Sequence, residues 1–158
     1  MNSKIKYLYF FPLFFVASIN ANAQSQYANE VDIKAAYCLG ATQRFPESMV
    51  ENLSPLAAEI FNLNNANHLR LQKFSIARAK SMNIAAIREM TAALTAGKEA
   101  YQRSVLISNA CLNEVYPNKD AAWDTVTTKN LQDCAIRKQG KSEVQRLEQC
   151  KDLSFLPY

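Results

Sequence analysis

The amino-acid sequence predicts an all-α fold: a small helical bundle of four main helices plus a short C-terminal helix, stapled by two disulfides. Turn-forming residues are scarce, with three glycines and five prolines in 158 residues. Ala, Leu, Lys, Glu and Gln are abundant, and these residues favour helices over many short strands. The chain also contains four cysteines, an even number that suits two bridges.

Residues 1–23 have the pattern of a secretory signal peptide. Two lysines precede an apolar run over 7–19, and Ala21-Asn22-Ala23 supplies a small-x-small cleavage site. We therefore expect a mature chain of residues 24–158, folded as a single helical domain and either periplasmic or fully secreted. The alternative is an uncleaved membrane anchor, but the run is shorter than the ~20 residues that a membrane-spanning helix needs.

The charge of the mature chain gives little reason to expect nucleic acid as a partner. Removing Lys4 and Lys6 with the signal, which contains no acidic residue, lowers the net charge from +4 to +2. We therefore expect no nucleic-acid partner and, because no later apolar run is long enough, no stable membrane insertion.

The four cysteines are expected to form two structural disulfides, since an exported protein meets an oxidising compartment. Three pairings of Cys38, Cys111, Cys134 and Cys150 are possible. If the first and third helices end at the same height along the bundle, Cys38 and Cys111 lie at nearly the same height. Cys134 and Cys150 lie on either side of a turn at Gly140 and could close a local hairpin. We therefore expect Cys38–Cys111 and Cys134–Cys150, each stabilising by roughly 3–4.5 kcal/mol. A metal site is the alternative, but no closely spaced cysteine pair is present.

The first two helices are expected before and after Pro46. Residues 30–44 place Val31, Ala35, Cys38 and Leu39 on one face. The second helix has Ser54 as its cap and Pro55 at its first position. Its apolar stripe is Leu56, Ile60, Leu63, and then Leu69, Leu71, Phe74 and Ile76. Asn62, Asn64, Asn65 and Asn67 predict a kink or a short break between these two runs, because Asn competes for backbone hydrogen bonds.

The third helix, over about 84–116, is expected to be the longest. One stripe is formed by Ile87, Thr91, Leu94, Tyr101, Val105 and Leu112. A second stripe is formed mainly by small side chains: Ala86, Met90, Ala93, Gly97, Ala100 and Ser104. Small residues allow close approach of a neighbouring helix, so this helix is expected to lie centrally, with neighbours on two sides.

The last elements are less regular in sequence. A fourth helix is expected from Asn118 or Asp120, with Trp123, Val126 and Leu131 facing inward. Ser142 and Gln145 match a capping box that would begin a short last helix ending near Cys150. The apolar tail over 154–158 either packs across the bundle or projects.

Residues for catalysis are few, and we expect no catalytic, cofactor or metal site. His68 is the only histidine, and we expect it to face solvent or cap a helix. Glu47-Ser48 resembles the Glu-Ser step of lytic transglycosylases, which implies Glu47 as the acid of a cell-wall glycan hydrolase of lysozyme-like size. The resemblance covers two residues, and the Gly-Leu-Met-Gln run of those enzymes is absent.

A run of basic residues is the clearest candidate binding feature. Arg70, Lys73, Arg78, Lys80 and Arg88 follow His68 before any acid occurs, and Arg70, Lys73 and Lys80 share one helical face. This stripe suits an acidic envelope or secreted protein, or an anionic polymer. The alternative is a solvated face balanced by acids of another helix. A second basic group flanks the last bridge: Arg137, Lys138, Lys141, Arg146 and Lys151.

The sequence therefore favours an exported, non-catalytic protein that works by binding, of the inhibitor or immunity type. Its contact residues would be Arg70, Lys73, Lys80 and Arg88, or Phe155 and Tyr158 of the tail. The alternatives are the glycan hydrolase and a structural or stress-related envelope protein that associates through the small-residue stripe.

Overall fold

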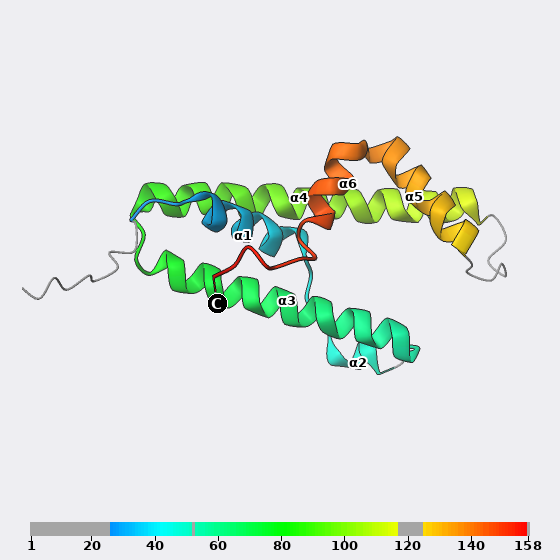
Figure 1. The fold of residues 1–158 in the computed structure, drawn as a ribbon, viewed down its shortest axis with the longest axis horizontal. Coiled ribbons are helices and arrows are strands. Elements are labelled where there is room, and N and C mark those ends of the chain that lie inside the picture. Colours follow the sequence, from blue (N-terminus) through cyan, green and yellow to red (C-terminus); the bar gives the residue numbers. More distant parts are fainter. Residues whose placement is uncertain (1–25, 52, 117–124, 158) are drawn as a thin grey trace, which may run out of the picture.

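The computed structural model describes residues 26–51, 53–116 and 125–157, so the predicted signal peptide lies outside the described residues. The described residues form six helices and no strand, which confirms the all-α bundle stapled by two disulfides (Figure 1). In chain order the helices are α1 (Glu30–Ala41), α2 (Glu47–Val50), α3 (Pro55–Ala79), α4 (Ile84–Val115), α5 (Thr125–Gln139) and α6 (Lys141–Glu148). The single-turn α2 was not predicted.

Helix α1 is short, lies between α3 and α4, and is capped at both ends. At its start Asn29 and Asp32 form a capping box, in which each side chain accepts a hydrogen bond from the other's backbone N–H, at 2.9 and 3.0 Å. At its end the Thr42 hydroxyl donates to the carbonyl of Cys38 at 3.0 Å. The helix therefore stops three residues before the predicted end at Arg44.

Helix α3 runs without a break from Pro55 to Ala79, so the predicted break is absent. Its start was predicted correctly, since the Ser54 hydroxyl accepts from the backbone N–H of Ala57 and Pro55 follows the cap. The Asn side chains do not compete with the helix because three of them bond to other segments. Asn64 donates to the carbonyl of Gln43, Asn65 bonds to the N–H and carbonyl of Phe45, and Asn67 donates to the carbonyl of Lys151.

Helices α1 and α4 approach closely through the predicted small-residue stripe. A Cβ atom added to Gly97 would lie 2.0 Å from the carbonyl oxygen of Tyr37, and one added to Gly40 would lie 2.1 Å from that of Leu94. Ala86 and Ala100 of the same stripe are buried. The stripe is therefore occupied by α1 within the chain, which confirms the predicted close neighbour.

Helices α5 and α6 carry the chain back along α4. Gly140 alone joins them, with φ +85°, a conformation that side chains rarely adopt. The predicted capping box at Ser142 is wrong, because α6 already begins at Lys141 with Gly140 as its N-cap. The predicted start of the fourth helix and Trp123 lie outside the described residues, as does the side chain of Val126; the described helix begins at Thr125.

The disulfides are Cys38–Cys150 and Cys111–Cys134, so both predicted pairings are wrong. The prediction assumed that the first and third helices end level. In fact α1 ends beside Lys98, and α4 continues for about 17 residues, roughly 25 Å at 1.5 Å per residue. Cys111 therefore lies far beyond Cys38 and pairs with Cys134 of α5, while the turn at Gly140 returns Cys150 to α1.

The hydrophobic core lies at one end of the molecule. Its buried members are Ala35, Cys38, Ala41, Leu71, Cys150, Leu153 and Leu156. The tail supplies Leu153 and Leu156, so it packs across the bundle rather than projecting. We call α1, residues 68–79, residues 84–100 and residues 150–157 the packed end. The open end is α2, residues 55–67, residues 101–115, α5 and α6. Among the described helices, none is sufficiently long and apolar to span a membrane.

Candidate functional site

The candidate functional site is an open groove of about 740 Å³ at the open end of the molecule. One wall is α3, and the other is formed by α4, α5 and α6. The lining includes Ile60, Leu63, Asn64 and Asn67 of α3; Tyr101, Ser104 and Ser108 of α4; and Leu131, Ala135, Val144 and Leu147 of α5 and α6. Ala41 and Thr42 close it at the C-terminal end of α1. In Figure 1, α3 and α4 diverge beyond the end of α1.

The groove exists because α1 is shorter than its two neighbours. At the packed end α1 fills the space between α3 and α4. Beyond Thr42 the chain leaves this space towards Pro46 and α2, while α3 and α4 continue. The groove therefore continues the space between α3 and α4 that α1 occupies at the packed end, which we call the seat of α1. No helix of the described chain lies in this continuation.

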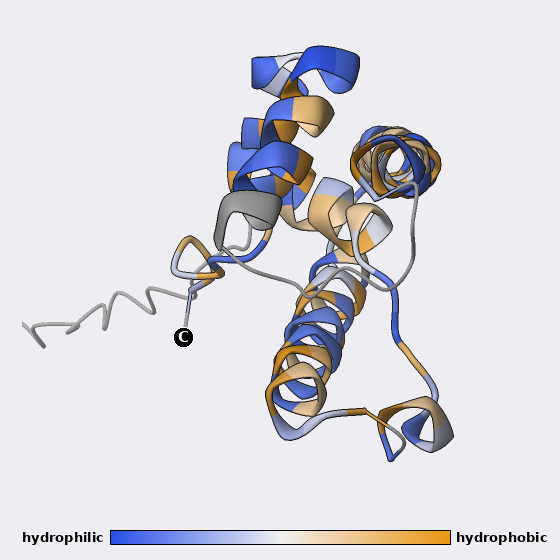
Figure 2. Ribbon diagram, turned by 90° about the vertical axis from the view of Figure 1, so that its right-hand side faces the viewer, coloured by the Kyte–Doolittle hydropathy of each residue, from blue (hydrophilic) through white to orange (hydrophobic). Residues whose placement is uncertain are grey.

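Apolar side chains on α3 are left exposed as a result. Leu56, Ile60 and Leu63 continue the helical face that buries Leu71 at the packed end, and they are 69%, 59% and 62% exposed. The first half of the predicted stripe, Leu56, Ile60 and Leu63, is thus one helical face, but it has no partner among the described residues. Figure 2 shows apolar segments on the part of α3 nearest the viewer, apart from the end of α4. An exposed apolar face of this kind is a candidate binding surface.

The Asn-rich stretch and α2 hold the back of this wall. The Asn65 amide bonds both backbone groups of Phe45, at 2.8 and 3.1 Å, and the Phe45 ring meets that of Phe61 edge-on at 4.5 Å. These contacts fix the segment after α1 against the side of α3, so it does not fold back into the groove.

The charges that line the groove cancel. Its charged residues are Glu148 and Lys151, whose side chains pair at 2.6 Å. The remaining lining is apolar, hydroxyl or amide. An occupant of this groove would therefore present an apolar and uncharged face.

The first basic stripe is exposed and unpaired. Arg70, Lys73, Lys80 and Arg88 are all exposed, and none forms an ion pair with a carboxylate of the described residues. The predicted alternative, in which acids of another helix balance this stripe, therefore finds no support in the described part of the chain.

Four of the five residues in the second basic group form ion pairs. Arg137 and Lys138 pair with Glu114 at 2.6 and 3.0 Å, and Arg146 lies 3.4 Å from Glu143. Lys151 pairs with Glu148, as described above. Both hydrogen bonds to Glu114, with the two cationic charges, lower the pKa of that exposed carboxyl group. Sequence alone did not distinguish the two basic groups.

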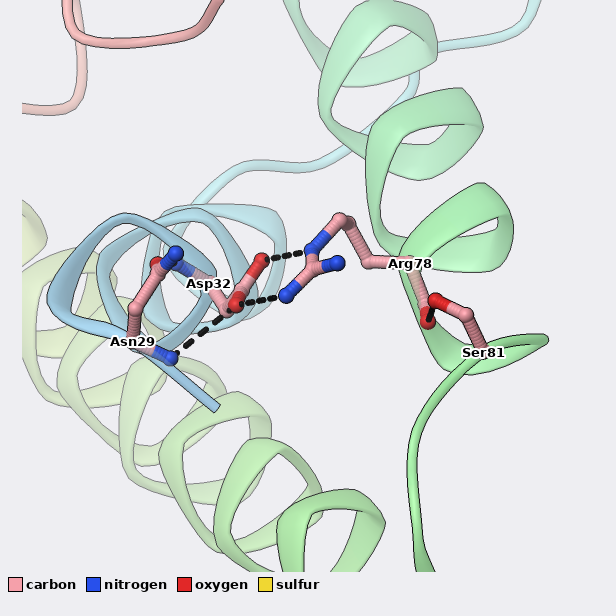
Figure 3. Close-up of polar contacts among 4 residues, drawn as sticks. All are labelled: Asn29, Asp32, Arg78 and Ser81. Carbon is pink, nitrogen blue, oxygen red and sulfur yellow. Dashed lines mark hydrogen bonds and ion pairs between the residues drawn. The ribbon is translucent and has the colours of Figure 1, made fainter. Parts of the chain in front are cut away.

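Arg78 is the one basic residue of the first run that is not exposed. It forms a buried ion pair with Asp32 at the packed end (Figure 3). Its guanidinium donates two hydrogen bonds to Asp32, at 2.6 and 2.7 Å, and Asp32 is fully buried. Burial raises the pKa of Asp32, but the hydrogen bonds from Arg78 and the Asn29 N–H, with the charge of Arg78, outweigh it and lower the pKa overall. The pair fixes α1 to α3.

The predicted contact residues of the tail differ in position. Phe155 is half-buried against the core, and the Lys34 ammonium lies 4.2 Å from its ring centroid. Tyr158 lies outside the described residues. The described tail is thus part of the core, with one face of Phe155 occupied by Lys34.

His68 is half-buried and neither faces bulk solvent nor caps its own helix, which corrects the expectation. Its Nδ1 lies 2.9 Å from the hydroxyl oxygen of Thr42, the C-cap residue of α1. Burial, and then the charge of Arg44, lower the pKa of His68, so the ring is neutral at pH 7. The same Thr42 hydroxyl lies 3.0 Å from the carbonyl oxygen of Cys38, so donor and acceptor roles in the contact with His68 depend on the tautomer of the ring.

Among the described residues there is no metal-ligand cluster, and the pocket beside Glu47 has one carboxylate. No group of three or more His, Cys, Asp or Glu among them could hold a metal ion. Glu47 is exposed on α2 beside a shallow pocket formed by Arg44, Phe45, Pro46 and Glu47, where it is the one carboxylate. A glycosidase uses a pair of carboxylates across its substrate.

No protein-family model, curated protein or solved structure matches this chain. Its function is therefore inferred from its own surfaces.

Proposed function

We propose that this chain is an exported, non-catalytic binding protein that accepts an amphipathic helical segment of another envelope or secreted protein in the groove between α3 and α4. The observation that carries the proposal is the groove's position as the empty continuation of the seat of α1. The space beside α1 already fits a helix, and its walls extend beyond Thr42 with exposed apolar residues. Recognition of a helix in an apolar groove is a common mode of peptide binding.

The composition of the groove defines the face of that segment. Because Glu148 and Lys151 neutralise each other, and the other lining residues are uncharged, the buried face of the partner should be apolar with small residues. The exposed stripe of Arg70, Lys73 and Lys80 lies further along α3 and its C-cap, outside the lining of the groove, and forms no ion pair among the described residues. Acidic residues of the partner outside the groove would be attracted to this stripe, which raises the rate of encounter.

Export is part of the proposal. It is supported by the signal-like residues 1–23 and by two disulfides, bonds that persist in oxidising compartments. Cell fractionation followed by N-terminal sequencing should find a mature chain that begins at Gln24 outside the cytoplasm. A cytoplasmic chain that retains Met1 would contradict export.

Site-specific photocrosslinking in the producing cell tests the groove. A photoreactive amino acid placed at Ile60 should crosslink to one partner protein, whereas the same probe at Ile76 should not. Ile76 is a matched control because it lies on the same helix, is 53% exposed and points away from the groove.

A second arm distinguishes binding from chance proximity. The double variant Ile60→Asn/Leu63→Asn should lose the partner on an immobilised chain, and Ile76→Asn should retain it. Equal crosslinking from positions 60 and 76, or retention of the partner by the double variant, would overturn the proposal.

A further inference from the structure

We infer that the pocket between α1, α3 and α4 on the Arg44 side of Thr42 is a binding site for a small oxyanion, a carboxylate or phosphate group of a free molecule. The pocket encloses about 630 Å³. Its lining comprises Leu39, Gly40, Thr42, Gln43, Arg44, His68, Gln72, Leu94, Lys98, Tyr101 and Gln102. It shares Thr42 and Tyr101 with the groove but opens on the other side of the segment that follows α1, and it does not depend on the proposed function.

The first argument is the uncompensated charge of the pocket. Arg44 and Lys98 both line it, no lining residue is acidic, and neither cation forms an ion pair with a carboxylate of the described residues. A guanidinium presents paired N–H groups that match a carboxylate or phosphate, and an ammonium adds a point charge.

The second argument is the supply of neutral donors around these two cations. The Tyr101 hydroxyl donates to Oε1 of Gln43 at 2.8 Å, which leaves the amide NH₂ of Gln43 as a donor. Gln72 and Gln102 add two further amides to the lining. A pocket with two cations, several amide donors and no carboxylate has the donor set of an oxyanion site.

The third argument is the state of His68. Burial first, and then the charge of Arg44, lower the pKa of His68, so Arg44 lies within electrostatic reach of the ring. The charged and titratable groups that line the pocket are Arg44 after α1, His68 of α3, and Lys98 and Tyr101 of α4. A bound anion would offset Arg44, so it should raise the pKa of His68.

The single histidine makes the site directly observable. We would titrate the oxidised, isotope-labelled chain with inorganic phosphate and, separately, with succinate, and follow the imidazole signals of His68 by NMR at constant ionic strength. Saturable shifts of His68 with either anion are expected, and the two arms show whether phosphate or carboxylate is preferred. In sulfate, whose charge is constant over the titration, His68 should titrate at higher pH than in chloride.

Charge-matched variants make the test decisive. Arg44→Gln and Lys98→Gln should each weaken binding by roughly tenfold or more, the usual effect of losing a charge-assisted hydrogen bond. Lys73→Gln removes the same charge from the exposed stripe and should leave affinity unchanged. The site would be overturned if chloride shifted the His68 imidazole signals as much as phosphate or succinate does. It would also be overturned if Lys73→Gln weakened anion binding as much as Arg44→Gln or Lys98→Gln, because either result shows a diffuse effect of charge. If the chain does not bind anions but still crosslinks from position 60, only the anion site is refuted. If the chain binds anions but does not crosslink from position 60, only the proposed function is refuted.

Discussion

The two ends of this molecule are built from the same helices but are stabilised in different ways. At the packed end, α1 lies between α3 and α4, two glycines bring backbones into contact, and a buried ion pair and the tail complete the core. At the open end, α5 is held to α4 by Cys111–Cys134 and by exposed ion pairs to Glu114, while apolar residues of α3 stay in solvent. The packed end therefore holds most of the interactions that stabilise the fold, and the open end is where we propose that the partner binds.

The largest effect is expected where α1 crosses α4. Gly97→Leu would place side-chain atoms inside the backbone of α1, since a Cβ alone would lie 2.0 Å from the Tyr37 carbonyl oxygen. Overpacking usually costs about 1–3 kcal/mol, and here the obstacle is backbone that cannot repack. We expect loss of cooperative thermal unfolding by circular dichroism. Ala92→Leu, at an exposed position of the same helix, should unfold as the wild type does. A normal transition for Gly97→Leu would show that the close crossing is absent.

The two disulfides should differ in their effect on stability. Cys38–Cys150 closes a loop of 112 residues and Cys111–Cys134 one of 23. On the chain-entropy model, their removal costs roughly 4–5 and roughly 3 kcal/mol respectively. Denaturant unfolding of the two double Ala variants measures both costs. Peptide mapping of the oxidised chain checks the connectivity, and recovery of a Cys38–Cys111 peptide would refute it.

The ion pair at the packed end should contribute to stability in a pH-dependent way. Asp32→Asn leaves the Arg78 guanidinium without its carboxylate, and breaking such a buried pair costs about 3–5 kcal/mol. The pKa of Asp32 is lowered in the fold, so its stabilisation is complete above the ordinary carboxyl value and is lost as the pH falls through the lower, folded value.

The variant should therefore show a flatter decline of stability in acid than the wild type. Urea unfolding across the acidic range gives both curves. If the two curves stay parallel down to the lowest pH, folding does not change the pKa of Asp32, and the ion pair with Arg78 is absent.

These results also show how far the sequence could predict the molecule. Strong local signals predicted the cap at Ser54, the first position at Pro55 and the small-residue face around Gly97, whereas the weaker capping-box pattern at Ser142 misplaced the start of α6. The disulfide pairing was not predictable, because it depends on the relative lengths and offset of α1 and α4, which no local pattern encodes. The predicted break in α3 is absent for a similar reason. Whether the Asn65 side chain bonds its own backbone or that of Phe45 depends on a contact between residues 20 apart in sequence, which a local pattern does not encode. The groove exists because α1 is shorter than α3 and α4. The sequence therefore predicted the apolar face of α3, but not that part of this face has no helix packed against it.

The smallest effect on stability is expected at the face for which we propose the largest effect on binding. Ile60→Asn/Leu63→Asn replaces side chains that are already 59% and 62% exposed, and exposed substitutions usually change stability by less than about 0.5 kcal/mol each. The thermal midpoint should therefore stay near that of the wild type, and replacing an exposed apolar residue by Asn should also reduce self-association. A marked fall in the midpoint would mean that this face is packed in solution, which would make the two ends alike and remove the binding surface on which the comparison depends.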